Sequence, residues 1–264
     1  MTSTEFFGKV ALVTGASGGI GSATCHMLAS RGASVALLDL NDVSVLSQTL
    51  ERVYGIRAIA VQVDVTNPES VEKAFSDVLA WSNRLDLCVN AAGIFPLGSN
   101  IDATEPSSWS KVIDVNLTGV FYCLRQELRA FQKLGIKGSV VNLSSDAGSV
   151  ATAGCAAYVA SKHAINGLTK TAAIEYAKIG HRINTVAPGN VDTPMIRKFG
   201  LTPEEISKAT QPTGRCARPE EVAELICFLL SERSPFMTGS IVAIDGGITT
   251  TGYSSGSSQD TFVN

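Results

Sequence analysis

The chain of 264 residues lacks several features that define other classes of protein. It has no run of lysine or arginine and its formal net charge is −3, so neither a nucleic-acid groove nor a polybasic membrane patch is expected. No apolar stretch is long enough to span a bilayer, and MTSTEFFGKV lacks the apolar segment of a signal peptide. We therefore expect a cytoplasmic protein with no nucleic-acid or membrane partner.

Paired cysteines are also missing. There is no CxxC pair and no Cys/His cluster, which argues against a disulfide framework and against a zinc or other metal site. The cysteines are scattered, and most lie in apolar runs typical of buried, reduced thiols. They are Cys25, Cys88, Cys123, Cys155, Cys216 and Cys227.

No linker rich in Pro, Gly or Ser interrupts residues 1–250, and no internal repeat is present. With 45% hydrophobic and 17% charged residues, the chain can build a sizeable core. We therefore predict a single domain over residues 1–250. The remaining residues, 251–264, are rich in Ser, Thr and Gly and predict a loose C-terminal tail.

Short apolar runs alternate with segments of helical period, which predicts an α/β fold. The expected class is one Rossmann-type, doubly wound parallel sheet with helices on both faces. The expected strands are 9–14, 34–40, 58–63, 85–90, 139–144, 182–187 and 240–244, and the expected helices are 19–31, 42–54, 68–82, 107–133, 156–179 and 219–231. Residues 190–218 contain Pro194, Pro203 and Pro212 and only a short helical pattern near 203–209, so we predict a substrate lid there.

A glycine-rich turn, TGASGGIG, joins the first strand to the first helix. Its glycines allow a tight turn and a close backbone approach, and a helix N-terminus offers N–H groups to a pyrophosphate. A glycine turn alone is weak evidence, but a strand before it and a helix after it are the confirming context. The cofactor residues predicted here are Gly15, Ser17, Gly19, Ile20 and Gly21.

Asp39 ends the second predicted strand, where an acid accepts hydrogen bonds from the adenosine ribose of a dinucleotide. A carboxylate there repels a 2′-phosphate, Leu40 is not basic, and residues 15–21 contain no Arg or Lys. The cofactor predicted is therefore NAD rather than NADP. The alternative is that Asp39 only caps a turn.

Tyr158 and Lys162 are four residues apart, so on a helix they share one face. A phenol titrates near pH ~10, and a neighbouring ammonium together with an oxidised nicotinamide favours the phenolate. The pair predicts a metal-free general base for an alcohol dehydrogenase. Taken alone, such a pair is also common on a solvated helix face.

Five motifs occur in one order over one domain: TGASGGIG, NAAG at 90–93, VNLSS at 141–145, YVASK at 158–162 and PG at 188–189. The set resembles the short-chain dehydrogenase/reductase family over roughly residues 8–248. The resemblance implies that Tyr158 is the acid/base and that Lys162 lowers its pKa and holds the nicotinamide ribose. It implies that Ser145 positions the substrate oxygen, selected over Ser144 by the spacing to Tyr158, and that Asn116 holds a relay water linked to Lys162.

The resemblance also implies further cofactor contacts. They lie around the adenine, near the adenosine ribose, and in a segment that closes over the nicotinamide: Asp64 and Val65; Asn90, Ala91 and Gly93; and Pro188, Gly189, Val191 and Thr193. Ala91 stands where the family often has a second Asn, a common variation.

The roles of two neighbours of the motifs stay open. Asp146 either contacts a polar group of the substrate or forms a turn with its own backbone, and His163 is interpreted as structural.

We therefore expect an NAD-linked oxidoreductase that transfers hydride between the nicotinamide and a small-molecule secondary alcohol or ketone. The alternatives are an NADPH-linked carbonyl or 3-oxoacyl reductase and a non-catalytic dinucleotide sensor on the same fold. Apolar residues of the loop after residue 90 and of the lid suggest a steroid-, terpenoid- or polyketide-like substrate, although a subunit contact would also bury them. They are Ile94, Phe95, Leu97, Met195, Ile196, Phe199 and Leu201.

The resemblance further implies a homodimer or homotetramer, packed through the helices near 107–133 and 156–179 and often through the last strand. Within the sequence, only small residues that permit close helix approach support this assembly. They are Ala156, Ala157, Ala160, Ala164 and Gly167.

Overall fold

The computed structural model describes residues 4–96, 98–197 and 202–250. The predicted tail, 251–264, and three of the residues named for the substrate pocket, Leu97, Phe199 and Leu201, lie outside the described residues. Among the described residues, no helix combines the length and apolar character needed to cross a membrane.

A seven-stranded, fully parallel sheet forms the centre of the molecule, with strand order β3-β2-β1-β4-β5-β6-β7. This confirms the predicted Rossmann-type class. Each strand lies within a residue or two of its expected bounds: β1 Val10–Thr14, β2 Ser34–Asp39, β3 Ala58–Gln62, β4 Leu87–Asn90, β5 Ser139–Leu143, β6 Arg182–Pro188 and β7 Ile241–Ile244.

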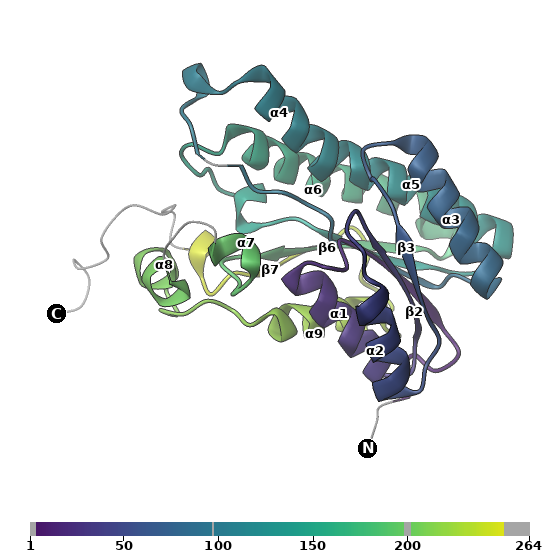
Figure 1. Ribbon diagram of the computed structural model, residues 1–264. Helices are drawn as coiled ribbons and strands as arrows, with labels where there is room; N and C mark the ends of the chain where they lie inside the picture. The colour runs from purple at the N-terminus through teal and green to yellow at the C-terminus, as the bar shows by residue number, and fades with distance from the viewer. Residues whose placement is uncertain (1–3, 97, 198–201, 251–264) are drawn as a thin grey trace.

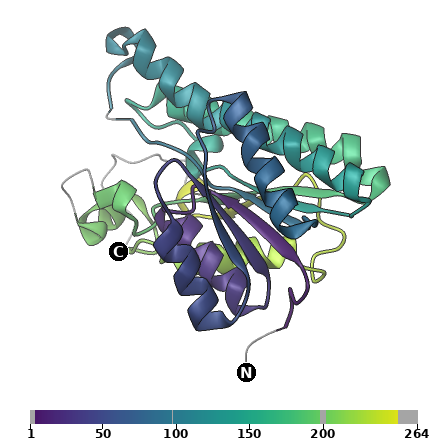
Figure 2. The ribbon, with the colours of Figure 1, turned by 45° about the vertical axis from the view of Figure 1, so that its right-hand side comes forward.

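Helices cover both faces of the sheet (Figure 1). One layer holds α1 (Gly19–Ser30), α2 (Ser44–Tyr54) and α9 (Pro219–Leu230); the other holds α3 (Pro68–Ser82), α4 (Pro106–Ile113), α5 (Gly119–Leu134) and α6 (Ala156–Tyr176). The view in Figure 2 shows the sheet between these two layers. Successive strand residues enter opposite layers, so Leu12 packs in the core on the α5 side and Val13 in the core on the α1 side.

The order of the strands fixes where a ligand can bind. The chain passes outward from β1 to β2 and β3, then returns to β4 on the other side of β1. A crevice forms beyond the carboxyl ends of the strands at such a switch point. Thr14 at the end of β1 pairs with Asn90 at the end of β4, which places the glycine-rich turn beside the NAAG segment.

The single helix expected over 107–133 is divided. A π-helical turn, η2 (Asp114–Thr118), separates α4 from α5. The extra residue in a π turn shifts the face that each later side chain presents, and such turns are frequent at functional sites. Gly119 follows directly, and a Cβ there would lie 2.9 Å from Val65 Cγ2, so the close packing of this turn on Val65 requires glycine. Asn116 lies within η2.

Residues 190–218 contain α7 (Pro194–Arg197) and α8 (Pro203–Thr210), the latter at the place of the expected short helix. Val191 forms an isolated bridge with Ala217, which ties the two ends of this segment together. Both short helices lie outside the two main helix layers (Figure 1).

Candidate active site

The glycine-rich turn is built so that backbone can approach it closely. Gly15 has φ +66°, and a Cβ there would lie 2.6 Å from the backbone nitrogen of Ala92. A Cβ on Gly19 would lie 2.6 Å from the methyl group of Thr193. Helix α1 begins beyond Gly18 with no side-chain cap and no acidic residue in its first turn. Its first N–H groups are therefore available to an anion, as a dinucleotide pyrophosphate requires.

The Asp39 carboxylate lies beside this turn and is buried. The Ser17 N–H donates to Oδ2 at 2.9 Å, and the Asn41 N–H donates to Oδ1 at 2.9 Å. The Asn41 Nδ2 also donates to Oδ1 at 3.1 Å, and a carboxylate has about four acceptor positions. Asp39 thus both caps a local turn and keeps acceptor capacity for a ribose hydroxyl. A second ribose bond requires the Asn41 amide to turn away.

Asn41 is a residue that the sequence interpretation missed. Its Nδ2 donates both to Asp39 and to the Ser17 hydroxyl, at 3.3 Å for the latter, so it holds the predicted cofactor-selecting carboxylate against the glycine turn. The signal in the sequence was an Asn two residues after an Asp at a strand end, a pattern typical of side-chain-to-backbone turns.

The other predicted cofactor residues follow the ends of β3, β4 and β6. The exposed Asp64 accepts hydrogen bonds from the Thr66 N–H and hydroxyl, at 2.9 and 2.7 Å, and Val65 packs against Gly119. A Cβ on Gly93 would lie 3.3 Å from Asn116 Oδ1 and 3.9 Å from Lys162 Nζ. Gly93 is therefore where the cofactor segment and the catalytic cluster meet.

The Asn90 side chain does not face the cofactor cleft. Its Nδ2 donates to Asn142 Oδ1 at 2.9 Å and to Glu127 Oε2 at 3.3 Å, inside the core between β4, β5 and α5. Any contribution of Asn90 to a cofactor therefore comes from its backbone. The expectation that Asn90 lines the end of the strand is correct in position, but its side chain serves the protein interior.

The segment after β6 lies over the glycine turn. A Cβ on Gly189 would lie 2.8 Å from the Asp245 carbonyl oxygen, so Pro188–Gly189 passes close to the chain after β7. Val191 is buried, and Thr193 contacts the space above Gly19. Residues 188–193 thus lie beside the glycine turn, and their closure over a bound dinucleotide stays a prediction.

Tyr158 and Lys162 lie in the first two turns of α6, and Lys162 Nζ is 5.5 Å from the centre of the Tyr158 ring. Lys162 Nζ donates to the Leu143 carbonyl at the end of β5, at 2.8 Å. Burial lowers the pKa of Lys162 to about 8. Burial raises the pKa of Tyr158 to about 12, against a smaller lowering by its hydrogen bond with Ser145.

Burial therefore outweighs any lowering of the Tyr158 pKa within the chain itself, and the role of Lys162 in lowering that pKa together with an oxidised nicotinamide stays a prediction. Asp146 raises the pKa of Tyr158 further. The positive charge of an oxidised nicotinamide would act in the lowering direction, as the sequence prediction requires.

The two adjacent serines have different partners. The Ser144 hydroxyl donates to the Lys162 carbonyl at 3.1 Å, within the protein. The Ser145 hydroxyl donates to Asp146 Oδ1 at 2.6 Å and forms a hydrogen bond with Tyr158. Ser145 is thus the serine that faces the tyrosine, and to donate to a substrate oxygen its hydroxyl must turn away from Asp146.

Asn116 and Phe95 complete the cluster. Asn116 is fully buried; its Nδ2 donates to the Ile94 carbonyl at 2.9 Å, and its Oδ1 accepts from the Ile94 N–H at 2.8 Å. These bonds fix the loop after β4, which places the Phe95 ring 4.6 Å from the Tyr158 ring. The role of Asn116 toward a relay water stays a prediction. The exposed His163 ring forms a hydrogen bond with the Val159 carbonyl at 2.9 Å, and its interpretation as structural stays a prediction.

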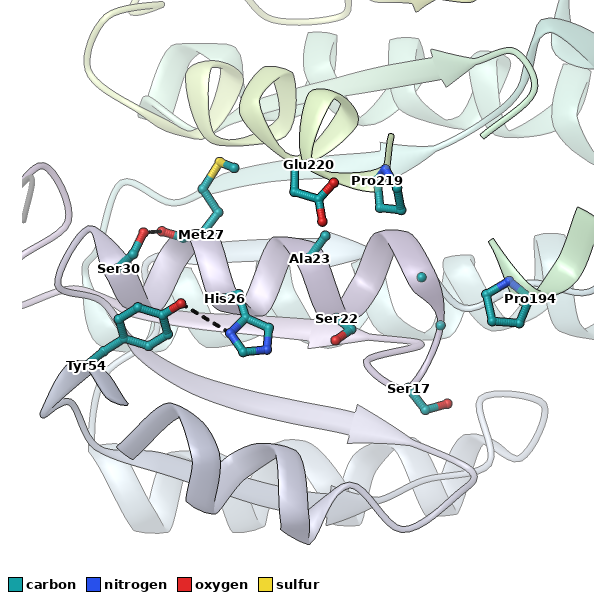
Figure 3. A pocket seen from close by; sticks show the side chains of 12 residues that line it. Ser17, Ser22, Ala23, His26, Met27, Ser30, Tyr54, Pro194, Pro219 and Glu220 are labelled. Atoms are coloured by element: carbon teal, nitrogen blue, oxygen red, sulfur yellow. Dashed lines mark hydrogen bonds between the residues drawn. The ribbon is translucent and has the colours of Figure 1, made fainter. Parts of the chain in front are cut away.

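A separate groove of about 480 Å³ runs along the outer side of α1 (Figure 3). It starts at Ser17 and Gly19, and Pro194 and Glu220 lie at its edge. Farther along the helix, His26 is hydrogen-bonded to the Tyr54 hydroxyl at 3.3 Å. None of the four predicted catalytic side chains lines this groove, so it adjoins the pyrophosphate turn and not the site of hydride transfer.

The described residues hold no group of three or more His, Cys, Asp or Glu that could bind a metal ion. None of the six cysteines, all of which lie in the described part of the chain, forms a disulfide there, and Cys216 is the one that is not buried.

Comparisons with known proteins agree with this geometry. The family model described as enoyl-(acyl carrier protein) reductase matches residues 15–249. Cis-4-hydroxycyclohexanecarboxylate dehydrogenase of Sinomonas cyclohexanicum is 41% identical, over 92% of this chain and 98% of that protein. Cyclohexanol dehydrogenase of Acinetobacter sp. (strain SE19) is 38% identical, over 94% and 97%.

Among solved structures, a 3-oxoacyl-[acyl-carrier protein] reductase with bound NAD from Brucella melitensis superposes with a TM-score of 0.83. It is 31% identical, and the match covers 94% of each chain. The fold, the motifs and these relatives together show that the chain belongs to the short-chain dehydrogenase/reductase family and is an oxidoreductase of secondary alcohols and ketones that uses NAD(P).

Proposed function

We propose that the protein oxidises a secondary alcohol on an apolar ring, with NAD as hydride acceptor. The observation that carries the proposal is the cluster of Ser145, Tyr158 and Lys162 beside the glycine turn that Asp39 borders. Bound NAD supplies a hydride acceptor, the C4 atom of its nicotinamide, and a positive charge. The chain supplies orientation and a base.

In this proposal, Ser145 holds the alcohol oxygen and Tyr158 takes its proton. Lys162, anchored on the Leu143 carbonyl, holds the nicotinamide ribose and passes the proton toward solvent with Asn116. Phe95 covers one side of Tyr158 and limits the access of water to its hydroxyl.

An apolar cyclic substrate is supported by two observations. Phe95 presents a ring surface directly against Tyr158, and Met195, 39% exposed, lies at the start of the predicted lid. The names of two relatives specify alcohols on a cyclohexane ring, one of them with a carboxylate as a second substituent. Larger steroid-, terpenoid- or polyketide-like alcohols remain within the proposal.

Preference for NAD is supported by the buried Asp39 and the exposed Leu40, where a 2′-phosphate would need a cation. Because cells generally keep the NAD pool oxidised, the preference favours alcohol oxidation. The NADPH-linked carbonyl or 3-oxoacyl reductase is the alternative within the fold, and Asp39 argues against it. A non-catalytic dinucleotide sensor would not require Ser145, Tyr158 and Lys162 together.

The proposed organisation is one domain over 1–250 with a lid over 190–218, in a homodimer or homotetramer of a cytoplasmic protein. Trp109 on α4 and Phe121 on α5 are 41% and 46% exposed, which supports a subunit contact over these helices.

The test is turnover of a panel of cyclic secondary alcohols, including cyclohexanol, with NAD⁺ or NADP⁺, followed by the absorbance of the reduced cofactor. We expect turnover with NAD⁺ and much weaker turnover with NADP⁺. Turnover with NADP(H) alone favours the reductase alternative. Dinucleotide binding with no turnover of any alcohol or ketone favours the sensor.

A further inference from the structure

Asp146 lies next to the reacting centre and has no part in the function described so far. It begins η3 (Asp146–Gly148), and its Oδ1 accepts the Ser145 hydroxyl at 2.6 Å. The Ser145 Oγ in turn accepts from the Ala147 N–H at 3.2 Å. The Asp146 side chain therefore folds back onto the Ser145 side chain. The turn considered from the sequence involved only the backbone of Asp146.

The position of this carboxylate relative to a substrate follows from one distance. Asp146 Oδ1 is 2.6 Å from Ser145 Oγ. A substrate oxygen bound to Ser145 Oγ by an ordinary hydrogen bond therefore lies no more than about 5.5 Å from Asp146 Oδ1. A charge across the ring from that oxygen then lies within roughly a Debye length, about 10 Å, of Asp146, where screening in a partly buried site is incomplete.

Among the described residues, no cation forms an ion pair with Asp146. The other charged group that acts on it is a carboxylate, Asp245, and together with burial it raises the pKa of Asp146. Asp245 is held by hydrogen bonds from Thr249 and from the Gly247 N–H. Lys162, the cation of the cluster, is directed to the Leu143 carbonyl. The negative field of Asp146 also reaches Tyr158, whose pKa it raises.

We propose that Asp146 is a specificity-determining residue: its carboxylate excludes ring alcohols that carry a negative charge and selects uncharged ones. The inference rests on the proposed function, because it places the substrate oxygen on Ser145. The name of one relative supplies a charged test compound, cis-4-hydroxycyclohexanecarboxylate.

The experiment compares two substrates that differ in charge and little in shape, cis-4-hydroxycyclohexanecarboxylate and its carboxamide. In the unmodified protein we expect kcat/KM for the carboxylate to be below that for the carboxamide by about tenfold or more, the size of a like-charge interaction in such a site. Asp146→Asn keeps the Oδ1 acceptor for Ser145 and removes the charge. We expect it to raise the carboxylate-to-carboxamide ratio by about tenfold.

Asp77→Asn is the matched control. Asp77 is on α3, has a partly exposed side chain and pairs with Lys73, so this variant changes the net charge by the same amount far from Ser145. We expect its carboxylate-to-carboxamide ratio to equal that of the unmodified protein. A ratio raised equally in both variants would assign the effect to overall charge and would overturn the proposal.

A binding measurement keeps the test independent of turnover. Cyclohexanecarboxylate and cyclohexanecarboxamide are titrated by calorimetry into each protein saturated with NAD⁺. The ratio of their dissociation constants should shift toward the carboxylate only in Asp146→Asn. An unchanged ratio in that variant refutes the role of Asp146. Absence of turnover with every alcohol, with the binding ratio still shifted, contradicts the proposed function and leaves the charge selection by Asp146 supported.

Discussion

At the scale of single residues, burial opposes ionisation of both members of the catalytic pair, Tyr158 and Lys162. Burial moves the pKa of Tyr158 up to about 12 and that of Lys162 down to about 8, so both shifts oppose ionisation. A cation beside the phenol is the physical means of reversing the first shift. Catalytic power at this site is therefore expected to appear only when an oxidised nicotinamide is bound.

Replacing Tyr158 by Phe should abolish turnover while NAD binding survives, since only the ionisable hydroxyl is lost. Lys162→Ala should lower both kcat and cofactor affinity, because Lys162 is assigned to both the base and the ribose. Steady-state kinetics and calorimetric titration with NAD⁺ measure the two effects. Substantial kcat in Tyr158→Phe would exclude Tyr158 as the base.

Asp39 carries the prediction on cofactor choice. A 2′-phosphate beside this buried carboxylate meets a like charge at a cost of a few kcal/mol, about a hundredfold in affinity. Asp39→Ser combined with Leu40→Arg should shift the ratio of kcat/KM values toward NADP by about that factor. Asp39→Ala combined with Leu40→Arg tests the same shift without a new hydroxyl. Equal kcat/KM values for NAD and NADP in the unmodified protein would refute the role of Asp39.

At the scale of elements, helix α5 binds the sheet through a buried carboxyl. Glu127 is fully buried, accepts from Asn90 Nδ2 at 3.3 Å, and leaves Oε1 without a hydrogen-bond partner. Burial raises its pKa to about 8. The carboxyl is therefore protonated at neutral pH in the folded protein and ionised in the unfolded chain.

This difference predicts how stability depends on pH. Between about pH 4.5 and 8, the unfolded chain loses the Glu127 proton and the folded protein keeps it, so this group lowers stability as pH rises. Glu127→Gln removes that dependence. Relative to the unmodified protein, the free energy of unfolding of this variant should rise by a few kcal/mol from pH 5 to pH 8. Each unit of the Glu127 pKa shift corresponds to about 1.4 kcal/mol. Urea denaturation at both pH values measures it, and a pH-independent difference would contradict the assignment.

At the scale of the whole molecule, the predicted assembly should use the α4–α5–α6 layer (Figure 2), where Trp109 and Phe121 are partly exposed. Phe121→Arg should shift the protein toward monomer, because it places a charge in an apolar contact. Val53→Arg on α2, in the opposite layer, is the control and should leave the oligomer intact. Sedimentation at micromolar concentration reads out both, and a monomeric unmodified protein would contradict the prediction.

The order of elements could be predicted from the sequence, since apolar period and turn residues are properties of neighbouring residues. The same reasoning placed Tyr158 and Lys162 on one helix face and Asp39 at the end of β2. The π turn at 114–118 could not be predicted this way. It depends on the packing of Gly119 against Val65, and Val65 belongs to the loop after β3, far from Gly119 in the sequence.

By itself, the sequence determined the doubly wound class, the glycine turn and the residue types of the catalytic cluster, because each is encoded within a few consecutive positions. Tertiary structure alone decided which groups these residues contact. It directs the Asn90 side chain into the core, Ser144 to the Lys162 carbonyl and Asp146 onto the Ser145 hydroxyl. The physical reason is that a buried polar atom takes the partner that packing places within reach. That partner comes from an element distant in the chain for Asn90 and Ser144, and from a local backbone conformation for Asp146.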